Sequence, residues 1–359
     1  MAALVDALRN TGTTQTPKVC TMPLYLPPEW SPEWSQDILG PDFHTATMPL
    51  GDDPDGETDI YATVVRYSPT DAHRLRSRPA MLFVHGMSDY FFHRHVAEFF
   101  HQCGWAVYAI DLRKCGRSWR PGQRWHHTTD VTQYFKELTS ALAYLSEMHN
   151  TVVIQGHSTG GLVVALWLDH LRHTDPELHA HVAGAILNSP WLDMMVPKPV
   201  SETLKPVLRW AGARWPDVSM PAGNLTAYGK SVSAEHYGEW VIDPEMKPLS
   251  GHQKNIGWLR AIIRGQDAIH SGTTDCGVPL LVLCSTESRS GRKYSPKVDT
   301  ADVILDVRQI QHWAPTLSSD VTVSPIPDAR HDVYLSQPAV RDAALKRVEQ
   351  WLASIGYSN

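Results

Sequence analysis

Short apolar runs rich in β-branched and aromatic residues alternate with amphipathic helical patterns along most of this chain. Strands separated by helices of about a dozen residues or more run parallel, because each crossover returns the chain to the same edge of the sheet. The sequence therefore predicts an α/β fold with a mostly parallel central sheet and helices on both faces. Strands are expected at 43–50, 60–67, 79–84, 105–110, 151–155, 182–187, 278–284 and 320–326, and helices at 90–102, 130–148, 160–173 and 339–354.

The alternation stops between residues 191 and 275 and resumes at Val278. The intervening stretch is rich in proline and contains five of the 13 tryptophans, together with two helical patterns. Because the strand pattern resumes after it, we expect one core domain, formed by 43–190 and 276–359, with a largely helical cap inserted at 191–275. Residues 1–42 are dense in proline, which disfavours regular helix, and are expected to form an arm that packs through its tryptophans.

The composition excludes several classes of protein. Hydrophobic residues make up 42% of the chain, which is enough for a sizeable core, and the net charge of −6 lacks the basic character of a nucleic-acid-binding protein. Five cysteines are too few for a disulfide scaffold and favour the reducing cytoplasm, although a Cys276–Cys284 bridge stays open. We expect neither a signal peptide nor a transmembrane segment, and the sequence does not indicate an oligomeric state.

The strongest chemical signal is the motif Gly-His-Ser-Thr-Gly at 156–160. It follows an apolar strand and opens an apolar helix, which is the setting of a nucleophile elbow. The glycines allow a turn so tight that the hydroxyl of the central serine is exposed near the positive end of a helix. The motif predicts Ser158 as a catalytic nucleophile.

A serine hydroxyl needs a base to remove its proton and a carboxylate to orient that base. In this topology the chain order is Ser, then Asp or Glu, then His, with the histidine after the last strand. His331 fits, because it follows the strand at 320–326 and is the last histidine of the chain. The acid should follow the strand at 278–284, where the spacing alone leaves four candidates: Glu287, Asp299, Asp302 and Asp306.

The tetrahedral intermediate of such a reaction needs backbone N–H donors for its oxyanion. One donor is expected from Thr159, directly after the nucleophile. The second is expected from the loop after the third strand, where Val-His-Gly-Met at 84–87 ends an apolar run. The N–H of Met87 is the candidate there.

Three motifs together resemble the α/β-hydrolase superfamily, and within it the branch of monoacylglycerol lipases and lysophospholipases that is also labelled serine-aminopeptidase-like. They are Val-His-Gly-Met at 84–87, Asp-Leu-Arg-Lys-Cys-Gly-Arg-Ser at 111–118 and the serine motif at 156–160. Lys114 stands where that branch usually has a glycine, a difference expected to matter little for the chemistry. The acid of the branch lies in an Ala-Asp-x-apolar-apolar-Asp pattern, which 301–306 matches, so the resemblance favours Asp302.

The resemblance implies an α/β-hydrolase fold and a serine hydrolase that cleaves carboxylic esters, such as a monoacylglycerol or a lysophospholipid, through an acyl-enzyme on Ser158. An acyltransferase or amidase with the same residues is the alternative, and a non-catalytic ligand-binding protein is a more distant one. We expect a small ester or lipid-like substrate, no nucleic-acid partner, no cofactor and no metal, because serine hydrolysis needs neither.

Two groups of aromatic residues remain open in function. Tryptophans of the cap are expected either to line an acyl pocket above Ser158 or to form the core of the cap: Trp191, Trp210, Trp215, Trp240 and Trp258. Clustered histidines lack the cysteine or carboxylate spacing of a zinc site, so we expect them to be solvated surface residues: His93, His95, His126, His127, His170, His173, His179 and His181.

Overall fold

A computed structural model describes residues 30–69, 75–195, 198–220, 225–291 and 293–357 of the chain. A nine-stranded sheet forms its centre, with the strand order β1-β2-β3-β5-β4-β6-β7-β10-β11. The strands are β1 Ser35–Asp37, β2 Gly40–Gly51, β3 Ile60–Tyr67, β4 Ala80–Val84, β5 Ala106–Asp111, β6 Val152–His157, β7 Val182–Asn188, β10 Leu280–Ser285 and β11 Val321–Ile326.

The prediction of a mostly parallel sheet is confirmed. From β5 across the sheet to β11 every neighbouring pair of strands is parallel, whereas β1, β2 and β3 add an antiparallel edge. β6 lies between β4 and β7, with Gly156 opposite Val84 on one side and Leu187 on the other. The end of β6 is therefore placed beside the loop that follows β4.

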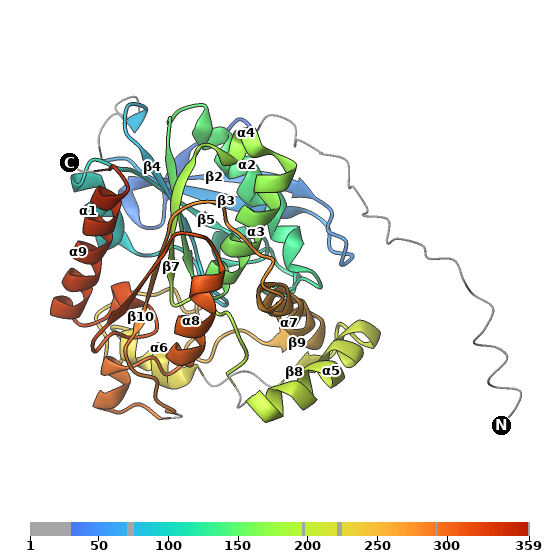
Figure 1. Cartoon of the computed structure of the whole chain (residues 1–359). Coiled ribbons are helices and arrows are strands. Elements are labelled where there is room, and N and C mark those ends of the chain that lie inside the picture. The colour runs from blue at the N-terminus through green and yellow to red at the C-terminus, as the bar shows by residue number, and fades with distance from the viewer. Residues whose placement is uncertain (1–29, 70–74, 196–197, 221–224, 292, 358–359) are drawn as a thin grey trace, which may run out of the picture.

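Helices cover both faces of the sheet, as Figure 1 shows. α1 and α9 pack on one face through an apolar cluster that includes Phe100 and Trp351, and α2, α3 and α7 pack on the other face through a larger cluster around Trp167. The helices are α1 Arg94–Gln102, α2 Phe135–Ser146, α3 Thr159–Thr174, α4 Pro176–His179, α5 Lys198–Arg214, α6 Thr226–Val232, α7 Ile256–His270, α8 Val307–Trp313 and α9 Pro338–Ser354.

The core begins earlier than the predicted boundary at residue 43. β1 and the first residues of β2 already belong to the sheet, because these two strands pair antiparallel through their backbones, with Asp37 opposite Gly40. Trp30 and Trp34 pack against Tyr144 of α2, with ring centroids 5.1 Å and 6.3 Å away. The part of the predicted arm before Trp30 lies outside the described residues.

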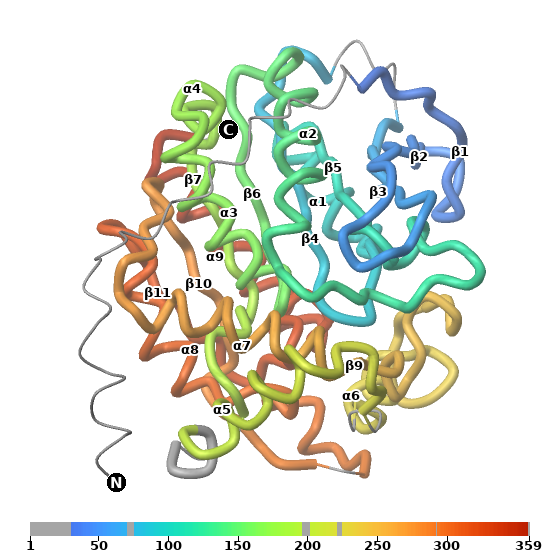
Figure 2. The backbone as a smooth tube through the Cα atoms, turned by 90° about the vertical axis from the view of Figure 1, so that its right-hand side faces the viewer, coloured from blue at the N-terminus to red at the C-terminus, as the bar shows by residue number. Residues whose placement is uncertain are grey.

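The segment between β7 and β10, which we call the cap segment, contributes no strand to the nine-stranded sheet in its described part. It contains α5, α6 and α7 together with a two-stranded sheet of β8 (Ser219–Met220) and β9 (Lys254–Asn255). Figures 1 and 2 show α5, α6 and β9 gathered at one end of the main sheet. The cap segment is therefore placed over the end of the sheet instead of extending it.

Cys276 and Cys284 are free thiols, so the bridge left open by the sequence is not formed. Cys20 lies outside the described residues. A search of the described helices finds none with both the length and the apolar character needed to cross a membrane.

Lys114 is fully buried and holds together two distant parts of the chain. Its ammonium group pairs with the carboxylates of Asp53 and Glu57, both from the loop between β2 and β3, and the Glu57 contact measures 2.8 Å. The residue has a φ of 58°, a left-handed conformation that suits the glycine usual at this position. Lys114 therefore has a role in the fold, because its side chain supplies the positive charge beside the buried carboxylate of Asp53 and beside Glu57.

We predict that Lys114→Met lowers the free energy of unfolding by about 3–5 kcal/mol, because it leaves the buried carboxylate of Asp53 without its counter-ion and Glu57 with Arg124 alone. Chemical denaturation at neutral pH, followed by tryptophan fluorescence, measures the change. Lys346→Met is the matched control, since Lys346 is exposed on α9 and its replacement should change stability by less than about 0.5 kcal/mol. Equal stability of the two variants would refute the structural role of Lys114.

Candidate active site

Ser158 occupies a strained turn between β6 and α3. Its φ of 52° and ψ of −116° lie outside the conformations that a non-glycine residue prefers. Two glycines make the turn possible. A Cβ on Gly156 would lie 2.8 Å from the carbonyl oxygen of Gly160, and a Cβ on Gly160 would lie 2.7 Å from that of Val84. The motif therefore forms the turn that the sequence predicts.

His331 lies on the loop between β11 and α9, beside the acid that the family resemblance favours. Its Nδ1 atom is 2.8 Å from Oδ2 of Asp302, and both side chains are almost completely buried. The other carboxylate oxygen of Asp302 accepts hydrogen bonds from the N–H groups of Ile304 and Leu305, each 2.8 Å long. The carboxylate is thus fixed by backbone donors and aimed at the imidazole.

The three alternative acids have other partners. Asp299 pairs with Arg330 at 2.8 Å, and Glu287 pairs with Arg289 at 2.8 Å. Asp306 caps the first turn of α8 and pairs with Arg308. Of the four candidates that the spacing left open, only Asp302 has a described contact with His331.

The loop after β4 lies directly against Ser158. A Cβ on Gly86 would approach the Cβ of Ser158 to 3.1 Å, so the absence of a side chain allows this contact. His85 stabilises the loop, because its Nε2 atom accepts a 3.0 Å hydrogen bond from the N–H of Leu112 after β5. Met87 follows in this loop, and Thr159 is the first residue of α3, where backbone N–H groups lack a partner within the helix.

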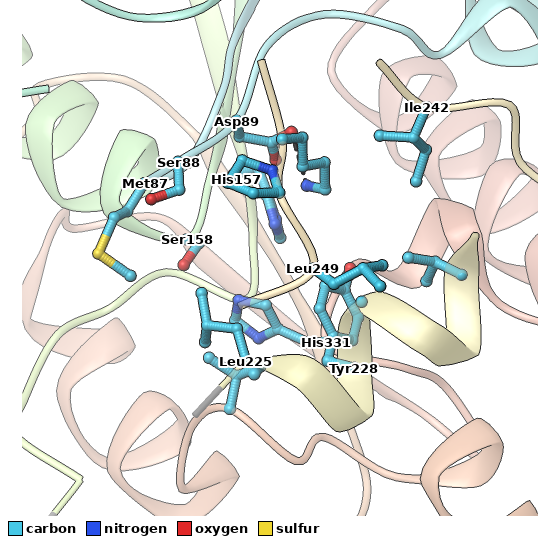
Figure 3. A pocket seen from close by; sticks show the side chains of 16 residues that line it. Met87, Ser88, Asp89, His157, Ser158, Leu225, Tyr228, Ile242, Leu249 and His331 are labelled. Carbon is cyan, nitrogen blue, oxygen red and sulfur yellow. Dashed lines mark ion pairs between the residues drawn. The ribbon is translucent and has the colours of Figure 1, made fainter. Parts of the chain in front are cut away.

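A cavity joins these elements. Ser158, His331, Met87 and His157 line it from the core, and residues 225–249 of the cap segment line its opposite wall. Figure 3 shows the side chains of Met87 and His331 on either side of Ser158, with Tyr228 rising from α6 beside the imidazole. Much of the remaining wall is apolar: Leu225, Val232, Ile242, Pro248, Leu249 and Ile304.

Comparisons with known proteins agree with this architecture. Residues 76–337 match the family model described as serine aminopeptidase, S33. The chain belongs to the serine aminopeptidase S33 family. This family falls within the α/β-hydrolase superfamily, and the resemblance noted in the sequence is thereby confirmed.

Lipases are among the proteins that this chain is similar to. A monoacylglycerol lipase of Mycolicibacterium smegmatis is 24% identical over 281 residues, which cover 77% of this chain and 89% of that protein. A soluble variant of the monoglyceride lipase of Saccharomyces cerevisiae, solved with a substrate analogue, has a TM-score of 0.59 at 14% identity and covers 88% of this chain and 96% of its own. The monoacylglycerol lipase of Paleococcus ferrophilus has a TM-score of 0.58 at 20% identity. This alignment covers 78% of the present chain and 97% of the lipase.

The five cap tryptophans do not line this cavity. Trp210 and Trp215 are exposed, at 63% and 46% of their surface. Trp240 stacks on His95, and the guanidinium group of Arg341 lies over the ring of Trp240. Trp191 and Trp258 are buried beside each other, where Trp258 borders a smaller neighbouring cavity. Much of the wall around Ser158 is instead aliphatic, and the three less exposed tryptophans pack against the core.

A buried ion pair links the cap segment to the loop after β4. Nζ of Lys247 lies 2.6 Å from Oδ1 of Asp89, and both residues line the cavity. Burial alone would raise the pKa of Asp89, but the charge of Lys247 and the neighbouring histidines lower it below its ordinary value. The pair places opposite charges together in the cavity wall.

Several histidines expected at the surface are buried, and one of them supports the loop of His331. Nε2 of His93 lies 2.8 Å from Asp332, a residue 239 positions away, and Nδ2 of Asn188 donates to the same carboxylate at 2.7 Å. His126, His127 and His179 are also buried. No local sequence pattern indicates these contacts, because their partners lie on distant segments. Among the described residues no cluster of three or more His, Cys, Asp or Glu side chains has the arrangement of a metal site.

We predict that Asp89→Asn lowers the free energy of unfolding by about 3 kcal/mol at neutral pH, because Lys247 is then buried without its carboxylate. The folded-state pKa of Asp89 is lowered from 3.8. Its ionised form therefore stabilises the protein fully above about pH 4, and this stabilisation decreases as the pH falls toward the folded-state pKa.

Denaturation of the wild type and Asp89→Asn between pH 7 and pH 2.5 checks this dependence. The difference in stability should be largest at pH 7 and shrink below pH 4. Asp52→Asn serves as the control, since Asp52 is exposed. A difference that stays constant over this range would contradict a role for the charge of Asp89.

Proposed function

We propose that this protein is a serine hydrolase that cleaves carboxylic esters through an acyl-enzyme on Ser158. The observation that carries the proposal is the placement of Ser158 in a strained turn, facing a cavity shared with His331, whose imidazole contacts the buried carboxylate of Asp302. A nucleophile, a base and an orienting acid are the groups that acyl transfer to serine requires.

The residues divide the chemistry as follows. His331 takes the proton from Ser158 Oγ as this oxygen attacks the ester carbonyl, and a tetrahedral intermediate forms. The N–H groups of Met87 and Thr159 donate to its oxyanion. His331 then passes the proton to the departing alcohol, and the acyl-enzyme forms. Water, activated by His331 in the same way, releases the acid, while Asp302 holds the imidazole in the correct tautomer throughout.

A neutral ester with an aliphatic chain suits the cavity best. The aliphatic wall from the cap segment provides the apolar surface that an acyl chain needs. Lys247, which would otherwise attract an anion, is already neutralised by Asp89. The same pairing occupies the carboxylate that an aminopeptidase would need for the α-ammonium group of a peptide. These contacts support a monoacylglycerol-like substrate over a lysophospholipid or a peptide, in agreement with the named relatives.

We predict that Ser158→Ala lowers kcat for a nitrophenyl ester by about 10⁶-fold, because the nucleophile is removed. Asp302→Asn should lower kcat by about 10⁴-fold through loss of the correct tautomer of His331. Steady-state kinetics and labelling of Ser158 with a fluorophosphonate probe measure both effects.

Two matched variants serve as controls. Ser219→Ala changes an exposed serine of β8, and Asp306→Asn changes the neighbouring acid that caps α8, where asparagine caps equally well. Both should keep nearly full activity. Retained turnover in Ser158→Ala would exclude the proposed mechanism. A greater loss of kcat in Asp306→Asn than in Asp302→Asn would show that Asp306, and not Asp302, orients His331.

We further predict that 1-decanoylglycerol is cleaved with a kcat/KM at least about tenfold above that of the lysophosphatidylglycerol with the same acyl chain. The phosphate of the second ester finds no unpaired cation in the described wall, and desolvating an unpaired charge is unfavourable. Both esters are assayed below their critical micelle concentrations. The variant Asp89→Asn leaves the charge of Lys247 unpaired. It should therefore lower the ratio of the kcat/KM value for 1-decanoylglycerol to that for the lysophosphatidylglycerol. Equal kcat/KM values for the wild type would show that the paired charges do not select the substrate.

A further inference from the structure

Asn188, the last residue of β7, connects the turn of Ser158 with the loop of His331. Its backbone oxygen accepts a 2.9 Å hydrogen bond from the N–H of Ser158 and lies 3.1 Å from Nδ1 of His157. Its side chain, which is 3% exposed, reaches the two residues directly after His331. Asn188 therefore contacts the segment of the proposed nucleophile through its main chain and the segment of the proposed base through its amide.

The amide of Asn188 makes two hydrogen bonds of opposite direction. Nδ2 donates to Oδ1 of Asp332 at 2.7 Å, and Oδ1 of Asn188 accepts a 3.3 Å hydrogen bond from the N–H of Val333. A carboxylate only accepts and a backbone N–H only donates, so the position needs a side chain that does both. His331 directly precedes these two residues, so where its backbone lies depends on them.

The carboxylate of Asp332 is also held by other segments. Nε2 of His93, on the loop between β4 and α1, lies 2.8 Å from Oδ2, and the N–H of Tyr334 donates to Oδ1 at 3.0 Å. Burial alone would raise the pKa of Asp332, but the neighbouring histidines and the hydrogen bonds from His93 and Asn188 lower it below its ordinary value. The carboxylate is therefore ionised at neutral pH and accepts all three hydrogen bonds.

Asp302 and Asn188 control different aspects of the imidazole of His331. Asp302 contacts Nδ1 and so fixes the orientation of the ring. The distance from the ring to Ser158 depends instead on where the backbone of His331 lies relative to the turn. Proton transfer requires the two groups to be within hydrogen-bond reach, and a displacement of about 1 Å costs on the order of 100-fold in rate.

We propose that Asn188 is a positioning residue, whose side-chain amide sets the distance between His331 and Ser158 and thereby the rate of proton transfer. This inference rests on the proposed function, since it assigns how the nucleophile and its base are held together. The main chain of Asn188 holds one of them and its side chain holds the loop of the other, so a substitution can release the second contact and keep the first.

The variant Asn188→Leu tests this assignment, because it removes both hydrogen bonds of the amide and keeps the backbone bond to Ser158. With 1-decanoylglycerol we expect kcat to fall by about 100-fold. KM should change by less than about twofold, because Asn188 lies outside the wall of the cavity that holds Ser158. The rate of labelling of Ser158 by an alkyl fluorophosphonate should fall with kcat. All kcat values are expressed per molecule that the probe labels at completion, so a misfolded fraction does not count.

Asn188→Asp adds a dependence on pH that a purely structural role would not produce. Its side chain still accepts from the N–H of Val333 but donates to Asp332 only when it is protonated. Two carboxyl groups this close resist simultaneous ionisation, which raises the pKa of one of them. The labelling rate of Asn188→Asp relative to the wild type should therefore rise as the pH falls from 9 to 6. The same ratio for Asn188→Leu should stay constant, since His93 and His157, which face the same site, titrate in every protein compared.

Thr63→Val is the matched control, because Thr63 is a buried residue of β3 whose hydroxyl accepts a 3.0 Å hydrogen bond from Ser118. It also loses a buried hydrogen bond but should keep the kcat of the wild type. An unchanged kcat in Asn188→Leu would overturn the proposal, and so would a labelling ratio for Asn188→Asp that stays low at every pH. If the wild type is labelled at Ser158 but cleaves no ester, the proposed function alone fails, because the labelling rates of the variants still test Asn188.

Discussion

The close approach of two backbone segments underlies the site. The turn at Ser158 lies so near the loop after β4 that neither Gly86 nor Gly160 has room for a side chain. This contact follows from the parallel pairing of β4 with β6, which brings the carboxyl ends of both strands to the same edge. Ser158, at the start of α3, and Met87, in the loop after β4, thereby line the same cavity.

The cap segment forms the wall of the cavity opposite Ser158. Its aliphatic residues supply the apolar wall, Lys247 neutralises Asp89, and Tyr228 packs on the catalytic imidazole that we propose. The tryptophans that made this segment conspicuous in the sequence serve a different purpose, since those that are buried fix it to the core. The cap segment thus contacts the core both at the wall of the cavity and through its buried tryptophans.

The sheet and the site motif were largely predictable from local patterns. β3 and β11 lie within a residue of the expected limits, because alternating or continuous apolar runs directly reflect burial on a sheet. β1 was missed, since Ser-Gln-Asp lacks an apolar pattern and pairs only through its backbone. The acid of the site could not be chosen by spacing, because Asp299, Asp302 and Asp306 differ only in which partner the folded loop presents to each.

The sequence by itself determined the α/β class, the serine in its turn and the histidine after the last strand, because these depend on residue types at fixed positions within single strand–loop–helix units. Only the tertiary structure decided which acid contacts His331, that Lys114 and Lys247 hold buried carboxylates, and that the ring of Tyr228 packs against His331. Each of these contacts joins segments far apart in the chain. Their existence depends on how the elements pack, and no local pattern encodes that packing.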